Sequence, residues 1–191
     1  DAALALFTEK GFAATRGEEI AARAGLSKGA VYLYFPSKEA IIEGLVRRAV
    51  VPIAKSALQF AESFEGDPRL LITTLVRMLA GRVSQPQAMA SLRLLMREIL
   101  NFPELAAMYR REVLDRAIPV AEGVIRRGIE QGYLRPVDPH LTIRSVVGPL
   151  LAHVLLAEVF GITPPGGLDL DRLVENHLTI LFDGLSVSGG R

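Results

Sequence analysis

The sequence predicts an all-α fold, because apolar residues recur at helical spacing along nearly all of its 191 residues and no stretch alternates as a strand would. Signals for helix starts and ends support this prediction. Asp67-Pro68 and Asp138-Pro139 each place a side-chain acceptor at an N-cap and a proline in the first turn. Glycines at positions 11, 25, 66 and 132 stand where helices need a C-terminal cap with positive φ.

The expected helices are short in the first 50 residues and long afterwards, which predicts a small head followed by a larger helical bundle. We place a three-helix head at residues 1–46 and the bundle, which we expect to dimerise, at residues 47–191. Pro52 and Pro119 fall inside expected helices and should bend or break them. We expect a first helix that ends at about residue 10. The other expected helices span residues 18–24, 28–35, 38–64, 68–82, 87–100, 103–131, 139–160 and 168–185.

The stretch from residue 15 to residue 38 has the spacing of two helices that cross at a tight turn. The small Ala21 is followed four residues later by Gly25, which can take a positive φ, and six residues after that by Val31. Ser27 is a good N-cap for the second helix. This frame is typical of a helix-turn-helix, a motif that places its second helix in the major groove of DNA.

The second helix of this frame has an inward and an outward face. Val31 and Phe35 point inward, within about 40° of each other at 100° per residue. Outward, two small residues allow close approach to base edges and Leu33 can meet thymine methyl groups, while flanking tyrosines and a lysine can hydrogen-bond phosphates. The formal net charge of +1 does not itself indicate a nucleic-acid partner. The alternative is a plain helical hairpin, which leaves the outward Leu33 and two tyrosines without a partner.

The segments ALALFTEKGFAAT and EIAARAGLSKGAVYLYFPSKEA closely resemble the DNA-binding head of TetR-type repressors over about residues 3–45. The resemblance implies a head core of Phe7, Phe12, Ile20, Ala24, Val31 and Phe35. It implies that the DNA backbone is held by Thr15, Lys28, Tyr32, Tyr34 and Lys38, and that the bases are faced by Gly29, Ala30 and Leu33. With Arg16 and Ser27 added, these residues form the predicted DNA-binding set.

The start of the first helix of the frame departs from the TetR pattern. The family usually has a small hydroxyl residue and an apolar residue at the positions of Arg16 and Gly17. Thr15 and Glu18 have the spacing of a capping box, which would fix the helix start. Gly17 should loosen this corner by about 0.5–1 kcal/mol relative to alanine. Arg16 can instead reach a phosphate or the neighbouring minor groove.

The last two expected helices carry more apolar surface than a monomer needs, which predicts a homodimer. The TetR resemblance implies that these helices form a four-helix interface between two subunits. The most apolar stretch, residues 146–162, contains Gly148, Pro149, His153 and Glu158, so we expect an interface helix and no membrane span. The expected interface residues are Ile143, Val146, Val147, Leu150, Leu151, Val154 and Leu155 in one helix and Leu173, His177, Ile180, Leu181 and Gly184 in the other.

We expect a pocket for a small effector between helices of the bundle. Its candidates are polar or adaptable side chains among apolar neighbours, although methionine at helical spacing is usually core and a histidine in an apolar helix usually has a structural role. The apolar surroundings favour a hydrophobic or aromatic effector. The predicted effector-binding residues are Met78, Arg93, Met96, Arg97, Phe102, Tyr109, Arg116 and His153.

Several functional classes are disfavoured. The chain has no cysteine, and its three histidines lack metal-ligand spacing, so we expect no bound metal. No phosphate-binding loop or nucleophilic serine motif occurs. We therefore expect no cofactor, and we expect that the protein is not an enzyme. Glu98, Glu104 and Glu112 are interpreted as ordinary exposed helix charges. The lack of cysteine and of a signal-peptide pattern fits the cytoplasm. Because the chain opens with Asp1 inside an apolar helical pattern, we expect further residues before it.

The function predicted from these patterns is a transcriptional regulator, a repressor that a small hydrophobic effector releases from a palindromic operator. The alternatives are a regulator without a small ligand, whose body only dimerises or binds a protein partner, and a helical enzyme or transport accessory protein. A two-fold dimer suits the first prediction, because it sets two heads about 34 Å apart on the duplex.

Overall fold

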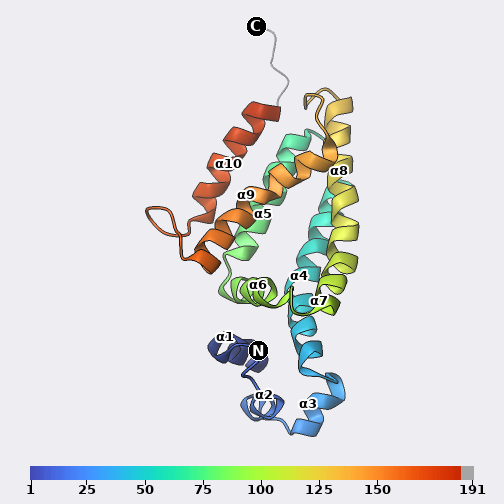
Figure 1. The fold of residues 1–191 in the computed structure, drawn as a ribbon. Helices are drawn as coiled ribbons and strands as arrows, with labels where there is room; N and C mark the ends of the chain where they lie inside the picture. Colours follow the sequence, from blue (N-terminus) through green and yellow to red (C-terminus); the bar gives the residue numbers. More distant parts are fainter. Residues whose placement is uncertain (186–191) are drawn as a thin grey trace. The chain divides into compact units, whose positions relative to one another are not determined.

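The computed structural model describes residues 1–185 and confirms the all-α prediction, with no β-strand in that range (Figure 1). The chain divides into two compact units. The first comprises residues 1–52 and 85–113, and the second comprises residues 53–84 and the chain from residue 114 onward. The predicted head, residues 1–46, lies wholly within the first unit, and residues 85–113, which the sequence assigned to the bundle, pack in that same unit.

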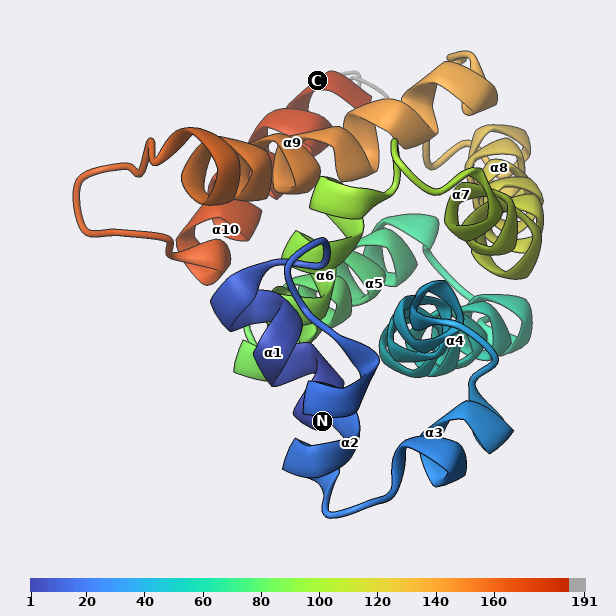
Figure 2. The same cartoon turned by 60° about the horizontal axis from the view of Figure 1, so that its bottom comes forward.

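The first unit is built around helix α1 (Ala2–Lys10), which packs against α2 (Gly17–Ala24) and α6 (Pro86–Glu98). Helix α3 (Lys28–Tyr34) follows α2 after a turn (Figure 2) and packs against it, and the first half of α4 (Lys38–Ser63) and α7 (Pro103–Tyr109) complete the unit. One continuous apolar core joins these helices. Its buried members are Ala3, Leu4, Leu6, Phe7, Phe12, Ile20, Ala21, Val31, Ile41, Ile42, Leu45, Val46, Leu94, Leu95, Leu105 and Met108.

The second unit consists of the second half of α4 with α5 (Pro68–Val83), α8 (Asp115–Glu130), α9 (Pro139–Phe160) and α10 (Leu170–Leu185). Helix α5 packs against α8, α9 and α10. The predicted caps are confirmed, because Asp67 accepts a hydrogen bond from the Arg69 N–H and Asp138 accepts one from the Leu141 N–H. The imidazole of His177 in α10 contacts the Val146 carbonyl of α9 at 2.8 Å.

The prolines expected to interrupt helices do not break them. Helix α4 continues through Pro52 and α8 through Pro119. The helix expected over residues 103–131 instead changes its winding at a π-helical turn, η1 (Arg110–Leu114). Within this turn Glu112 accepts three hydrogen bonds of 2.9–3.1 Å from Arg47 of α4, which hold the pKa of the carboxyl below its usual value. Glu112 is therefore a tertiary contact of the first unit, and its interpretation as an ordinary exposed charge was wrong.

Two residues of the predicted head core are misplaced. Ala24 is exposed near the end of α2, where Ala21 faces the core in its place. Phe35 is 37% exposed and follows α3, with its ring lying over Gly44 of α4. An ideal Cβ at Gly44 would lie 2.9 Å from Phe35 Cε1, so this glycine makes room for the ring.

Candidate nucleic-acid interface

The predicted crossing of two helices is present. Ala21 and Val31 are both buried in the core of the first unit. Gly25 adopts the left-handed conformation, φ 68° and ψ 28°, which lets the chain turn sharply after α2. The Ser27 hydroxyl oxygen accepts a hydrogen bond of 3.1 Å from the Ala30 N–H and so caps α3, as predicted. The local chemistry of the turn therefore fixes where α3 begins.

The outward face of α3 carries side chains that contact little of the protein. Leu33 is 79% exposed and Tyr34 is 78% exposed, although both belong to residue types that usually lie in the interior or at interfaces. Gly29 is exposed, and Ala30 and Tyr32 are half-buried. An exposed leucine between small residues on a helix of this motif has the form of a surface that meets another molecule.

The cation of α3 is paired within the head. The Lys28 ammonium lies 2.6 Å from the Glu18 carboxylate of α2 and 6.0 Å from the centroid of the Tyr32 ring. The hydrogen bond between the two side chains lowers the pKa of Glu18 and raises the pKa of Lys28. Both side chains are well exposed, so water and salt screen this pair and a phosphate can compete with Glu18 for the ammonium.

The structure corrects the prediction for Thr15. Its side chain is 1% exposed, and its hydroxyl lies 2.7 Å from the carbonyl of Gly11 and 3.3 Å from that of Leu6. Because the hydroxyl is turned into the core, it neither caps α2 nor faces a phosphate. The N-cap is Arg16, whose N–H donates to Glu19 at 2.9 Å. The helix start therefore uses the glutamate one position later than the predicted capping box.

Lys38 is also corrected. Its ammonium donates to the carbonyls of Phe12 at 2.7 Å and Thr15 at 2.8 Å, with a longer contact of 3.4 Å to Ala13. It also lies 4.3 Å from the centroid of the Phe12 ring. These partners use all three N–H groups of the ammonium. In this structure Lys38 ties the loop between α1 and α2 to the start of α4, a structural role that the sequence did not predict.

The predicted effector residues divide between the two units. Arg93, Met96, Arg97, Phe102 and Tyr109 lie in the first unit, and Met78, Arg116 and His153 lie in the second. Two of them lie against residues of the head. The Phe102 ring packs edge-on against Phe12 with centroids 4.7 Å apart, and the Arg97 guanidinium lies over Gly11 at the end of α1.

Two other predicted effector residues carry unusual polar groups. Tyr109 is largely enclosed beside the core of the first unit, and this burial raises the pKa of its phenol. In α9, the Nε2 atom of His153 is buried without a hydrogen-bond partner. A buried polar atom in this state is unfavourable unless another group reaches it. His153 therefore remains a candidate for a ligand contact.

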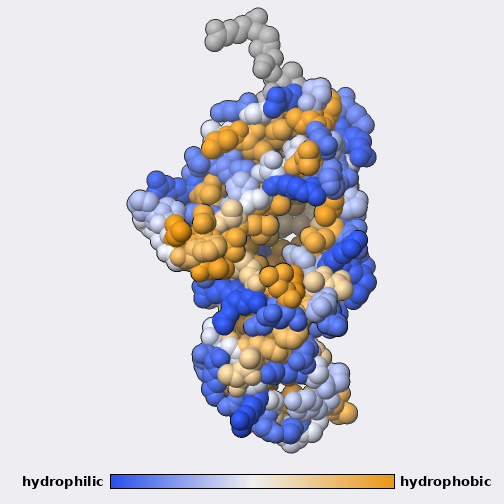
Figure 3. All heavy atoms as spheres, in the orientation of Figure 1, coloured by the Kyte–Doolittle hydropathy of each residue, from blue (hydrophilic) through white to orange (hydrophobic). Residues whose placement is uncertain are grey.

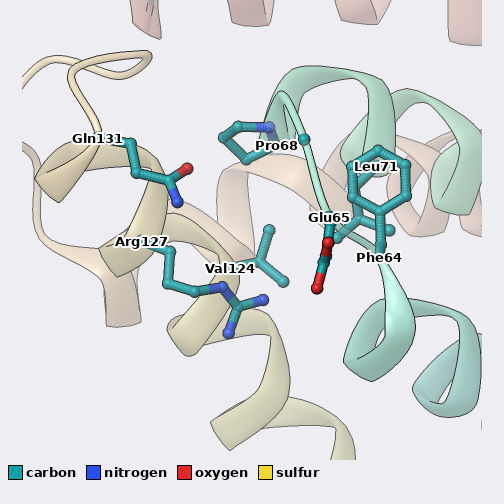
Figure 4. A pocket seen from close by; sticks show the side chains of 8 residues that line it. Phe64, Glu65, Pro68, Leu71, Val124, Arg127 and Gln131 are labelled. Atoms are coloured by element: carbon teal, nitrogen blue, oxygen red, sulfur yellow. The ribbon is translucent and has the colours of Figure 1, made fainter.

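A pocket of about 330 Å³ opens in the second unit, where the connection between α4 and α5 meets α8 (Figure 4). The side chains of Arg127 in α8 and of Gln131, which follows the last residue of α8, face Phe64 and Glu65 across it. None of the predicted effector residues lines this pocket. Its lining residues are Phe64, Glu65, Gly66, Pro68, Leu71, Val124, Arg127 and Gln131.

The predicted interface faces of α9 and α10 are partly internal. Leu150, Val154, His177 and Leu181 are buried within the chain, because α9 and α10 pack on each other and on α5. The remaining face is exposed and apolar, and Figure 3 shows apolar side chains gathered over α9. By length and composition, α9 is the one described helix that could also cross a membrane. The exposed large apolar residues of this face, which we call the α9–α10 face, are Leu151, Leu155, Leu156, Val159, Phe160 and Ile180.

Comparison with known proteins identifies the family of this chain. A profile described as bacterial regulatory proteins, tetR family, matches residues 1–45. A second, described as the tetracyclin repressor-like C-terminal domain, matches residues 63–176, more than half of the chain. The chain belongs to the TetR family. Members of this family are transcriptional regulators, which fits the helix-turn-helix and its exposed α3 face.

Individual TetR-family proteins match along nearly the whole chain. The HTH-type transcriptional regulator RutR of Escherichia coli strain K12 is 30% identical over 188 residues, covering 96% of this chain and 87% of RutR. The structure of SmeT, the repressor of the Stenotrophomonas maltophilia multidrug efflux pump SmeDEF, is 27% identical and has a TM-score of 0.76, covering 99% of this chain and 89% of that one. AibR in complex with isovaleryl coenzyme A and operator DNA shares the fold, with 19% identity, a TM-score of 0.70, and coverage of 96% and 95%.

Proposed function

We propose that this TetR-family regulator is a repressor that binds a palindromic operator as a two-fold dimer and is released by a small hydrophobic molecule. The observation that carries the proposal is the outward face of α3, where Leu33 and Tyr34 are almost fully exposed on the second helix of a helix-turn-helix. A repressor of bacterial genes acts in the cytoplasm, where the chromosome lies, and we place this protein there.

The proposed DNA contacts follow from what each exposed side chain of the head can do. Leu33, between the small Gly29 and Ala30, meets base edges and thymine methyl groups. Tyrosine hydroxyls and the Lys28 ammonium bind phosphates on the two walls of the groove, and these contacts hold the helix in register without reading sequence. The proposed contact residues are Arg16, Ser27, Lys28, Gly29, Ala30, Tyr32, Leu33 and Tyr34.

The dimer is proposed on the α9–α10 face. Its large side chains are exposed in one chain, on helices that also pack on each other and on α5. A second copy covers such a face by two-fold symmetry, because each protomer presents the same surface to the other. Arg144 and Glu158 lie within α9, and charged groups inside a membrane are unfavourable, so a protein partner suits this helix better than lipid.

An effector is proposed because SmeT, a relative in sequence and fold, is named as the repressor of a multidrug efflux pump. In this chain, the buried Nε2 of His153 supports a ligand contact in the bundle. Release then follows from a population shift, in which the ligand favours a bundle geometry that does not fit the half-site spacing.

The test is selection of bound duplexes from a random DNA library with the full chain, followed by titration of a panel of apolar and aromatic compounds against the selected complex. An enriched palindrome released by one compound supports the whole proposal. A palindrome that no compound releases favours a regulator whose body only dimerises or binds a protein. No enrichment by a folded dimer would overturn DNA binding.

Replacing Glu18 by glutamine is expected to strengthen DNA binding. The substitution frees the Lys28 ammonium, now 2.6 Å from the carboxylate, and removes a negative charge from the proposed DNA-binding face of the head. Affinity should rise about threefold to tenfold, and the slope of log affinity against log salt should steepen by about 0.9, the value for one more phosphate contact. Fluorescence anisotropy with the selected duplex at several salt concentrations measures both quantities.

The matched control is Glu9→Gln, which makes the same charge change in the head but frees Arg23, held by Glu9 at 2.6 and 2.8 Å. Arg23 lies outside the proposed contact set. Equal effects of the two substitutions would mean that only net charge matters and that Lys28 has no specific phosphate.

A further inference from the structure

Gly17 opens α2 at a point where a side chain cannot fit. An ideal Cβ built on Gly17 would lie 2.2 Å from the Tyr32 hydroxyl oxygen, and 2.9 and 3.0 Å from Cζ and Cε2 of its ring. These separations are well below van der Waals contact, so the phenol of Tyr32 occupies the space that a side chain at Gly17 would take. The sequence predicted that Gly17 loosens the start of α2. In the structure, a tyrosine from the next helix fills the space beside this glycine.

The backbone conformation at position 17 does not require glycine. Its φ is not positive, whereas seven other glycines of the described chain have positive φ. A residue with a side chain could adopt this backbone, and alanine is favoured over glycine by about 0.5–1 kcal/mol in a helix. The feature that the structure uses at this position is thus the missing side chain, which lets α3 place the Tyr32 ring against the first turn of α2.

We propose that Gly17 is a positioning residue for DNA binding. Because Gly17 has no side chain, the Tyr32 ring packs on the first turn of α2, a position that we call its seat, and from there the hydroxyl meets a phosphate. This inference rests on the proposed function. The seat fixes a ring that would rotate freely on an isolated helix, and a contact fixed before binding loses less conformational entropy when DNA arrives.

The surroundings of the ring support a fixed orientation. Tyr32 is half-buried, whereas Tyr34 on the same short helix is 78% exposed. The Lys28 ammonium lies 6.0 Å from the centroid of the Tyr32 ring, and Lys28 is itself joined to Glu18, the residue after Gly17. The ring thus packs on a backbone without a side chain on α2, and a cation of its own helix lies near it.

The test is a double-mutant cycle for binding to the selected duplex, made from Gly17→Ala, Tyr32→Phe and the double variant. Tyr32→Phe keeps the ring on its seat and removes only the hydroxyl, and we expect about fivefold weaker binding. Gly17→Ala displaces the ring, which is the mobile end of a side chain, and we expect a similar loss without unfolding. Because both changes remove the same contact, the double variant should bind about as well as either single variant.

Two further measurements separate positioning from a general effect on stability. The chain has four tyrosines, so carbon-13 labelling of tyrosine gives a simple spectrum in which Tyr32→Phe identifies the Tyr32 signal. In the free protein, Gly17→Ala should shift that signal and leave those of Tyr109 and Tyr133 in place. The control is Gly81→Ala in α5, where an added Cβ meets nothing within 4 Å, and which should leave DNA affinity unchanged.

The outcomes are distinct. Non-additive losses with a shifted Tyr32 signal support the inference. Additive losses of about 25-fold in the double variant, or an unmoved Tyr32 signal, overturn it while the wild-type chain still binds DNA. If the wild-type chain binds no duplex, the proposed function fails, and the role of Gly17 in DNA binding fails with it.

Discussion

Replacing Lys38 by methionine is expected to destabilise the head and to weaken DNA binding at least tenfold. The ammonium donates to the carbonyls of Phe12 and Thr15 at 2.7 and 2.8 Å and holds the loop that carries α2. Hydrogen bonds from a charged donor contribute up to about 1.5–3 kcal/mol each, but these two are only part-buried and water can reach the carbonyls in place of the ammonium, so about 2–4 kcal/mol should be lost in total. A Tm lower by about 5–15 °C would be measured by calorimetry.

The salt dependence of DNA binding distinguishes this role from a phosphate contact. If Lys38 acts on the loop, residual binding by Lys38→Met should keep the salt slope of the wild-type chain. A lysine that contacts a phosphate would lower that slope by about 0.9 when removed. The control is Lys55→Met, an exposed lysine in the same helix, which should change neither Tm nor affinity. An unchanged Tm with a shallower slope would restore the phosphate role.

Replacing Ile180 by aspartate is expected to separate the proposed dimer and to lower operator affinity at least about 100-fold. Ile180 is 65% exposed in the single chain, so the change should not disturb the fold of the second unit. In a two-fold interface the substitution occurs twice, and each copy places a charge in an apolar contact, which is strongly unfavourable without a partner. The two heads then bind independently, and the effective concentration of the second head is lost.

Sedimentation of the Ile180→Asp variant should show a monomer at about 10 µM, a concentration above the Kd of a typical stable dimer. Its circular dichroism spectrum should show an unchanged helix content. Leu70→Asp provides the matched control, because Leu70 is equally exposed, at 62%, but lies on α5 outside the α9–α10 face. This control should remain a dimer. A dimeric Ile180→Asp variant would place the interface on another surface.

Local chemistry accounts for the features that were predicted correctly. The caps at Asp67 and Asp138 and the bounds of α9 depend on residues within one or two helical turns of each other. The crossing of α2 and α3 depends on Ala21, Gly25 and Val31, whose spacing is short and whose sizes suit one geometry. Interactions of this range are encoded in the order of residues, so the head and its exposed α3 face could be predicted without coordinates.

The errors concern side chains whose partners are far away along the chain. Lys38 bonds carbonyls 23–26 residues before it, and Glu112 binds Arg47 across 65 residues. Among the effector candidates, Phe102 meets Phe12, 90 positions earlier, and so belongs to the core of the first unit. A sequence pattern shows that such residues are charged or aromatic but does not show which group each will meet.

The sequence by itself therefore determined the all-helical fold, the helix-turn-helix and the outward face of α3, because periodicity, caps and a tight turn are local properties. Only the tertiary structure decided that Lys38 and Thr15 bond the head's own carbonyls, that Glu18 holds Lys28, and that the absent side chain of Gly17 seats Tyr32. The physical reason is that a lysine, a hydroxyl or a glycine acquires its role from the groups that packing brings within about 3 Å of it.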